Sequence, residues 1–190
     1  MALNSQPSTL NYSLPLFFWL VLWLPCSLYA ALPKSVVVTD ELVAINGSVI
    51  AGAKKPKQEF QISRDGIVAV IGRPTKVNKS WFTSECGWDA LGIGLQYRDD
   101  IQQCTSLRFA LHPEPDLGTF RPYTGAIRVN GVPITPLTDP RVFRKMGFKK
   151  SPQGYARTVG IRETVLGVDT HGHIARVTIE LPKILDRSID

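Results

Sequence analysis

One segment that occurs twice limits what this chain of 190 residues can fold into more than any other feature of its sequence. Residues 43–50 and 127–134 both place strand-forming side chains on either side of an Asn-Gly pair. This pair favours the two-residue turn of a β-hairpin, because both turn positions then adopt positive φ. We therefore expect two β-hairpins that begin two related parts of the chain.

Each hairpin is followed by a segment with the features of a short capped helix, at residues 62–72 and 137–147. Ser63 and Thr138 occupy the expected N-cap positions, where a hydroxyl accepts a hydrogen bond from a first-turn amide. A glycine closes each segment, as is common where a helix ends in the left-handed conformation. Helices this short depend on tertiary packing.

A third match pairs residues 91–93 with 166–168, and an alternating strand pattern follows in both copies, at 107–111 and 174–181. Three matches in the same order favour internal duplication over coincidence. The sequence therefore predicts an α+β fold of two tandem related units, each with a hairpin, a short helix and antiparallel strands. The helices are expected to pack on one face of the sheet.

The predicted boundaries follow from these matches and from the proline content. The first α+β unit spans residues 36–111, and the proline-containing segment 112–124 is the expected linker. The second, shorter unit spans 125–182, and residues 183–190 form a tail.

The first 33 residues carry no charged side chain. An apolar run at 14–24 and the small residue Ala30 predict a secretory signal peptide at 1–30. The alternative is an uncleaved membrane anchor, because residues 14–32 are nearly as long as the roughly 20 residues that span a bilayer. No basic residue precedes the apolar run, which departs from the usual signal. We expect an exported protein, periplasmic or secreted, with anchoring by an uncleaved N-terminal segment as the alternative.

Three motifs, two in the first unit and one at the start of the second, resemble those of a group of uncharacterised bacterial envelope domains. In that group a helix ends in Leu-Gly-x-Pro-Thr, and here residues 71–75 read Ile-Gly-Arg-Pro-Thr. The group's Trp-Asp-x-Leu-Gly-Ile strand is matched at 88–93, and its Gly-x-Ile-x-Val-Asn-Gly segment at 125–131. More distantly, the helix motif is similar to the SmpA/OmlA outer-membrane assembly lipoproteins and to the β-lactamase-inhibitor-protein fold.

The resemblance implies a non-enzymatic accessory or binding protein of the cell envelope. Its partner is expected to be an envelope protein or an anionic surface, with membrane contact through residues 14–32. The tandem likeness to the inhibitor fold suggests a secreted inhibitor of another enzyme as the alternative. The second unit has Phe148-Lys149 and Glu163-Thr164 in place of the Pro-Thr and Trp-Asp pairs. We therefore expect it to keep the fold without the function of the first.

Trp81, Phe82 and Trp88, with Asp89 beside them, are the candidate binding residues, because aromatic side chains dominate the hot spots of protein interfaces. Core packing is the alternative for the same residues. Neighbouring residues of a strand point to opposite faces, so at least one of Trp81 and Phe82 is expected in the core.

Asp169, His171 and His173 bring a carboxylate and two imidazoles into five residues. A metal site needs three or four converging ligands. A polar turn is therefore the expected structure, and a metal-dependent hydrolase that uses these histidines is the alternative. The chain has no Gly-x-Ser-x-Gly sequence and no glycine-rich phosphate loop. The sequence therefore predicts no catalytic residue and no cofactor.

Cys86 and Cys104 would remain after removal of a signal peptide. An even number of cysteines in an oxidising compartment permits one disulfide. Two buried free thiols are the alternative.

The net charge is +6, and basic residues cluster at 54–57 and 144–150. Such clusters are expected to be solvated faces, with some cations at the end of the second helix. Phe148 is the one aromatic residue within these clusters, whereas proteins that bind single-stranded nucleic acid interleave several aromatic residues with their basic ones. We therefore expect no nucleic-acid partner.

Overall fold

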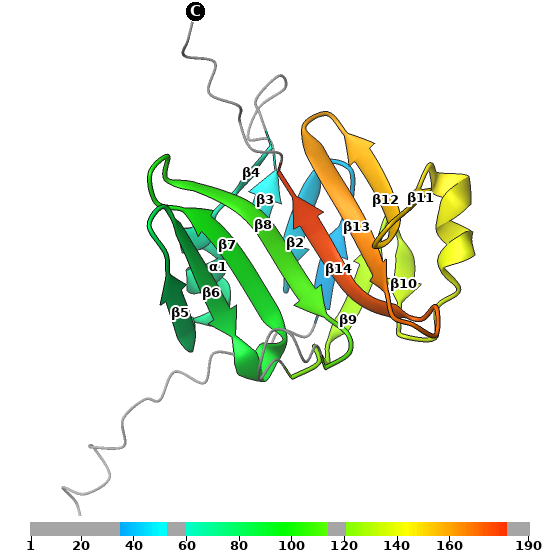
Figure 1. Cartoon of the computed structure of the whole chain (residues 1–190), viewed down its shortest axis with the longest axis horizontal. Coiled ribbons are helices and arrows are strands. Elements are labelled where there is room, and N and C mark those ends of the chain that lie inside the picture. The colour runs from blue at the N-terminus through cyan, green and yellow to red at the C-terminus, as the bar shows by residue number, and fades with distance from the viewer. Residues whose placement is uncertain (1–34, 53–59, 114–120, 182–190) are drawn as a thin grey trace, which may run out of the picture.

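A computed structural model describes residues 35–52, 60–113 and 121–181 (Figure 1). The predicted signal peptide, the alternative anchor at 14–32 and the tail at 183–190 lie outside the described residues. Of the described residues, 52% are in strands and 14% are helical. The protein is therefore mostly β.

The strands form two sheets. The six-stranded sheet has the order β10 (Val132–Ile134), β9 (Ala126–Val129), β1 (Ser35–Val38), β2 (Leu42–Ile45), β3 (Ser48–Gly52) and β4 (Gln61–Ile62). The eight-stranded sheet has the order β11 (Lys149–Ser151), β12 (Gly154–Val159), β13 (Arg162–Val168), β14 (Ile174–Glu180), β8 (Gln103–Ala110), β7 (Ile93–Arg98), β6 (Thr83–Trp88) and β5 (Lys76–Lys79). Among these strands, β1 and β9 are the parallel pair.

The two sheets pack face to face around one hydrophobic core, so the fold is a β-sandwich. The six-stranded sheet contributes buried residues such as Val36 and Ile45, and the eight-stranded sheet contributes Leu107, Phe109 and Val177. Figure 1 shows the eight-stranded sheet in front, with β2 and β9 behind it. Each sheet thus buries one face, as the alternation of its strands requires.

The predicted α+β fold, with helices on one face of a sheet, is wrong. The helix α1 (Arg64–Ile71) lies behind β6 and β7, whereas the 3-10 helix η4 (Pro140–Met146) lies at the opposite end of the sandwich, beside β10 and β11 (Figure 1). Ile67 and Ile71 of α1 are buried, and so is Phe143 of η4. The six-stranded sheet covers the face that the helices were expected to cover. The helices therefore lie only at the two ends of the sandwich.

The two halves of the eight-stranded sheet have the same connectivity. Its order is symmetric about the central pair of β8 and β14, with β5, β6 and β7 on one side and β11, β12 and β13 on the other. Both predicted Asn-Gly hairpins are present, between β2 and β3 and between β9 and β10. Each sheet takes strands from both sides of the predicted linker, so the two halves share their core.

The starts of the two helices differ from each other. Ser63 caps α1 as predicted, and its hydroxyl accepts a hydrogen bond from the Gly66 amide at 2.9 Å. The predicted cap at Thr138 is wrong, because Asp139 caps η4 by accepting from the Arg141 amide at 2.9 Å. Pro140 follows Asp139 directly and suits the first helical position, so this helix begins one residue later.

The third sequence match does not join equivalent positions. Residues 91–93 lie at the end of the 3-10 helix η2 (Asp89–Leu91) and the start of β7, whereas residues 166–168 end β13. In the second half a short turn connects β12 to β13, with no counterpart of η2. The offset between the two halves therefore changes after the helices, and the match at constant offset is a coincidence.

Candidate binding surface

The four candidate binding residues do not form one site. Trp81 is 93% exposed and Phe82 is 61% exposed, but Trp88 is 2% exposed and belongs to the core. The Trp88 indole Nε1 donates a hydrogen bond to the Gly72 carbonyl at 2.9 Å, at the end of α1. Trp88 is therefore not available to a partner.

Asp89 belongs to a set of contacts that fastens α1 to β6. The Asp89 amide donates to the Thr75 hydroxyl at 3.1 Å, and that hydroxyl donates to the Gly87 carbonyl at 3.0 Å. The Thr75 amide donates to the same carbonyl at 2.8 Å. The Pro-Thr and Trp-Asp motifs thus form one set of contacts, which holds the end of the helix against the inner side of the sheet. We call the contacts of Thr75, Trp88 and Asp89 the clasp.

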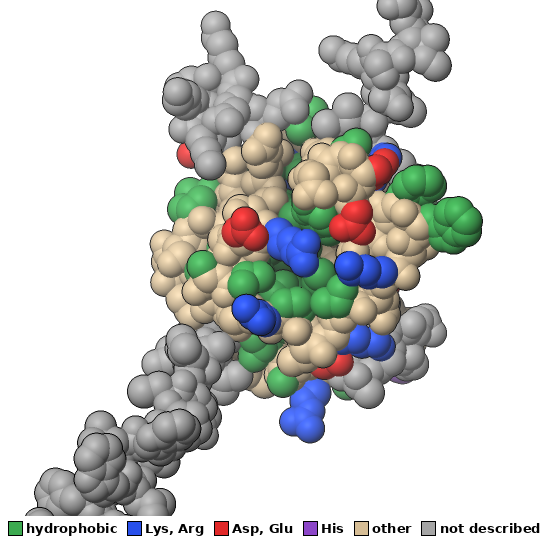
Figure 2. Space-filling model, turned by 90° about the vertical axis from the view of Figure 1, so that its left-hand side faces the viewer, with side chains coloured by type: hydrophobic (Ala, Val, Ile, Leu, Met, Phe, Trp, Pro, Cys, Tyr) green, Lys and Arg blue, Asp and Glu red, His purple; other side chains and the backbone are tan. Residues whose placement is uncertain are grey.

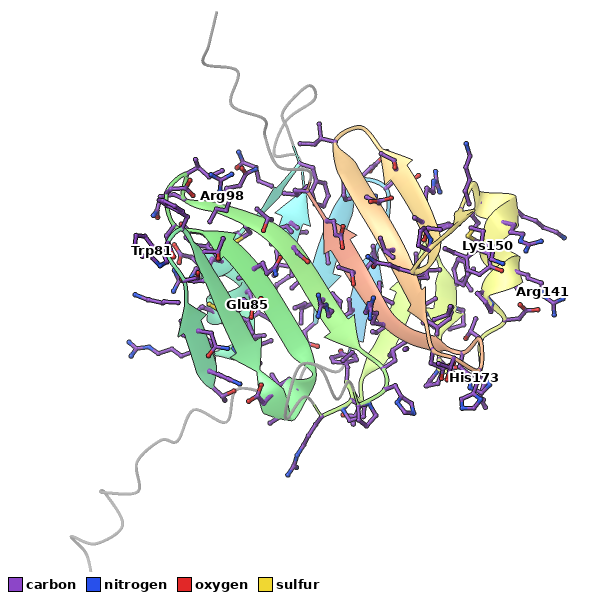
Figure 3. The ribbon with its side chains drawn as sticks, in the orientation of Figure 1. Trp81, Glu85, Arg98, Arg141, Lys150 and His173 are labelled. Atoms are coloured by element: carbon purple, nitrogen blue, oxygen red, sulfur yellow. The ribbon has the colours of Figure 1, made fainter. Side chains whose placement is uncertain are left out.

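Trp81 and Phe82 both point into solvent, which contradicts the prediction that one of them lies in the core. They occupy the turn between β5 and β6, which the Ser80 amide closes by donating to the Thr83 carbonyl at 2.8 Å. The alternation of a strand does not apply in a turn. Figure 3 shows Trp81 at the edge of the molecule, pointing away from the sheet.

A third exposed apolar residue lies close to this pair. The Asp99 amide donates to the Phe82 carbonyl at 3.0 Å, which joins the β5–β6 turn to the turn between β7 and β8. Ile101 is in that second turn and is 45% exposed. We call Trp81, Phe82 and Ile101 the apolar tip. Figure 2 looks onto this end of the sandwich and shows hydrophobic side chains standing out from its edge.

The charged side chains beside the apolar tip have both signs. Arg98 forms an ion pair with Asp100, and the hydrogen bond from Arg98 lowers the pKa of Asp100. Asp99 accepts a hydrogen bond from the Ser84 hydroxyl at 2.6 Å. Lys79 ends β5 just before the first turn. An apolar centre with a mixed polar rim is the usual composition of a protein–protein interface.

The segment with Asp169, His171 and His173 forms the turn between β13 and β14 (Figure 3). One Asp169 carboxylate oxygen accepts from the His173 amide at 2.9 Å and from the His171 amide at 2.8 Å. These backbone hydrogen bonds lower the pKa of Asp169. Within the described ranges, no three His, Cys, Asp or Glu side chains converge as a metal site requires. The carboxylate closes the turn instead.

Cys86 and Cys104 are both buried and unbonded, so the disulfide interpretation is wrong. They lie on β6 and β8, which β7 separates. Two steps across a sheet amount to roughly 10 Å, which is too far for a disulfide. Burial raises the pKa of both thiols, and that of Cys104 rises to about 12.

Comparison with protein families gives a match to the first part of the described chain. The model of a domain of unknown function, DUF7738, matches residues 36–143, which is more than half of the chain. The chain belongs to this family. The DUF7738 match runs from β1 into η4, so it includes the clasp and the apolar tip. No curated protein and no solved structure matches the chain. Among the helices that the structure describes, none has the length and hydrophobicity of a membrane-spanning segment.

Proposed function

We propose that this protein is a non-enzymatic binding protein, and that the apolar tip is the surface that contacts its partner. The observation that carries the proposal is the 93% exposure of Trp81, beside exposed Phe82 and Ile101. Three large apolar side chains on two neighbouring turns contribute little to the core. Their hydration is costly, and a partner that covers them gains the corresponding free energy.

The charges beside the tip favour a protein over an anionic membrane surface. Asp99 and Asp100 lie in the turn that carries Ile101, and carboxylates are repelled by anionic headgroups. A protein surface can offer complementary charges to both the carboxylates and Lys79. The anionic surface is therefore the less favoured of the two predicted partners.

The location in the cell envelope is part of the proposal and is supported by the uncharged segment of the first 33 residues. In that compartment the protein would act as an envelope accessory protein. An inhibitor of another enzyme is the second candidate function. It is favoured by the position of Trp81 in a projecting turn, which is a shape that can enter a cleft.

The test places a photo-crosslinking amino acid, p-benzoylphenylalanine, at position 81 in the full-length protein inside cells. The matched control places it at Leu137, which is 81% exposed and lies just before η4. We expect a discrete crosslinked product from position 81 that is absent from position 137. A second variant, Phe82→Ala, should reduce the yield of this product while the melting temperature stays unchanged.

Equal crosslinking patterns from the two positions would count against the apolar tip. Crosslinking to lipid alone at position 81 would show that the partner is a membrane. A crosslinked enzyme whose activity falls on addition of purified protein would favour the inhibitor.

A further inference from the structure

The end of the sandwich opposite the apolar tip concentrates positive charge. Residues 137–150 contain five Lys or Arg residues and one acidic residue, so this segment carries +4 of the net charge of +6. The five basic side chains are all exposed, and they belong to Arg141, Arg144 and Lys145 of η4 and to Lys149 and Lys150 of β11. Figure 3 shows Arg141 and Lys150 at the far end of the molecule from Trp81.

The fold brings the cations of η4 and β11 together around Tyr155 of β12. The Arg144 guanidinium donates to the Tyr155 hydroxyl at 3.4 Å and lies 5.7 Å from the centroid of its ring. Lys150 is the direct register partner of Tyr155, so the two side chains leave their strands on the same face of the sheet. Basic residues of two different elements therefore form one surface.

Little of this charge is neutralised within the segment. The one acidic residue, Asp139, forms an ion pair with Arg141 at 3.0 Å. Within the described ranges, Lys145, Lys149 and Lys150 form no ion pair. At least three of the five cations are thus left to attract an external anion.

Acidic residues elsewhere in this half of the molecule have other neighbours. Asp40 lies 2.6 Å from the Arg157 guanidinium, and Asp169 accepts hydrogen bonds from two amides of its own turn. Glu163 and Glu180 line a hollow on the other side of the sheet together with two arginines. None of these carboxylates is in an ion pair with the five basic residues.

Two aliphatic side chains are exposed among the cations. Leu137 is 81% exposed and Val142 is 42% exposed. Leu137 projects from a closed turn, in which the Thr138 amide donates to the Thr135 carbonyl at 3.0 Å. Residues three apart share a side of a 3-10 helix, so Val142 lies on the same side of η4 as Lys145. We call the five basic residues, Leu137 and Val142 the basic end.

We propose that the basic end binds the surface of an anionic lipid bilayer. Anionic headgroups attract Lys and Arg near the surface, and aliphatic side chains enter the boundary between headgroups and acyl chains. A soluble polyanion would attract the cations but would not cover Leu137 and Val142. The apolar tip has two carboxylates beside it, whereas at the basic end the one acidic residue is paired. The protein would therefore meet a membrane at one end, and this inference does not depend on the function proposed for the other.

Protection of a sheet edge is the alternative reason for the lysines of β11. Lysines on the edge strand β5 serve the same purpose, so this explanation applies equally to both ends. It does not account for the exposed aliphatic side chains or for the excess of positive charge at one end. A comparison of the lysines of the two edge strands therefore distinguishes the two explanations.

The test places p-benzoylphenylalanine at position 137 of the full-length protein and illuminates it with vesicles. One vesicle type has equal parts of phosphatidylcholine and phosphatidylglycerol, and the other has phosphatidylcholine alone. Mass spectrometry counts lipid adducts on the peptide that contains residue 137, so membrane contact through residues 14–32 does not contribute. We expect about ten-fold more adducts with the anionic vesicles, fewer at high salt, and few from the same amino acid at position 81.

The decisive variant is Lys149→Gln combined with Lys150→Gln, which should lower the adduct yield at position 137 about ten-fold. The matched control is Lys76→Gln combined with Lys79→Gln, which removes the same charge from the exposed edge strand β5. This control should leave the yield nearly unchanged. Both double variants alter exposed side chains, so their melting temperatures should equal that of the unaltered protein.

Equal adduct yields with the two vesicle types, or at positions 137 and 81, would overturn the proposal. So would equal losses in the two double variants, because the effect would then reflect net charge alone. Binding to heparin that depends on Lys149 and Lys150, without lipid adducts at position 137, would overturn it in favour of a soluble polyanion.

Discussion

The two halves of the eight-stranded sheet have the same strand order, but different contacts fasten their helices to it. In the first half, Trp88 and Thr75 form the hydrogen-bonded clasp between β6 and the end of α1. In the second half, Phe143 of η4 packs edge-on against Phe148, with ring centroids 5.5 Å apart. This topology therefore does not require one particular set of contacts between helix and sheet, and the motifs of the first half need not recur in the second.

The halves are also joined to each other by an ionic contact. The Asp40 carboxylate, in the turn between β1 and β2, lies 2.6 Å from the Arg157 guanidinium and 3.8 Å from that of Arg162. Arg162 is 2% exposed, donates to the Thr39 carbonyl at 2.6 Å and lies over the Phe60 ring. Burial lowers the pKa of Arg162. This contact connects the start of the first half to β12 and β13.

We expect the largest effect on stability from the two buried aromatic side chains that hold the helices, Trp88 and Phe143. Trp88→Ala should lower the free energy of unfolding by about 4–5 kcal/mol and Phe143→Ala by about 3–4 kcal/mol, because both leave a cavity and only Trp88 also loses a hydrogen bond. Urea unfolding followed by circular dichroism measures both values. Trp88→Phe is the control, since it keeps most of the volume and should cost much less. A larger loss for Phe143→Ala would show that the packing of Phe143 holds its helix more strongly than the contacts of Trp88 hold α1.

The second effect concerns the ionic contact between the halves. Asp40→Asn removes the carboxylate that faces the buried Arg162 guanidinium, and should cost about 2–4 kcal/mol in urea unfolding. The control is Asp139→Asn, which alters an exposed ion pair with Arg141 and should have little effect. Equal results for the two variants would mean that Asp40 does not compensate the buried charge.

Local sequence rules predicted the hairpins and the start of α1, because each depends on only a few neighbouring residues. The fold class was wrong because it depends on long-range pairing, such as that of β14 with β8 and of β9 with β1. The edge strands β5 and β11 are short and rich in lysine, so they carry no apolar alternation that would reveal them. Lysines at exposed sheet edges also oppose pairing with another chain.

The candidate site was predicted only in part. Trp81 and Phe82 were found from their residue type, whereas Ile101 was missed because a single isoleucine in a polar turn carries no signal. Its proximity to Phe82 follows from the hydrogen bond between the Asp99 amide and the Phe82 carbonyl.

The third effect concerns the dependence of the free energy of unfolding on pH. It distinguishes the two halves, because both thiols of the described residues lie in the first half. The pKa of Cys104 rises from 9.0 to about 12 in the folded protein. The folded state therefore keeps a proton that the unfolded state loses, so stability is complete below pH 9.0 and falls as the pH rises toward about 12. The loss for one such group is about 1.4 kcal/mol per pH unit at most.

Urea unfolding at several alkaline pH values, under reducing conditions, measures this dependence. Cys104→Ala should make the fall with pH shallower. Part of the fall should remain, because burial also raises the pKa of Tyr97 and that of Tyr123. An unchanged slope in Cys104→Ala would contradict the assignment to this thiol.

The smallest effect compares the caps of the two helices. Ser63→Ala should lower the free energy of unfolding by about 1 kcal/mol, because the Gly66 amide loses its acceptor. Asp139→Ala should cost less, since Pro140 has no amide to satisfy and a 3-10 helix has weaker hydrogen bonds. Thermal unfolding of both variants, with Ser63→Thr as the control that keeps a capping hydroxyl, gives the comparison. If Asp139→Ala proved the more costly, η4 would depend on its cap more than α1 depends on Ser63.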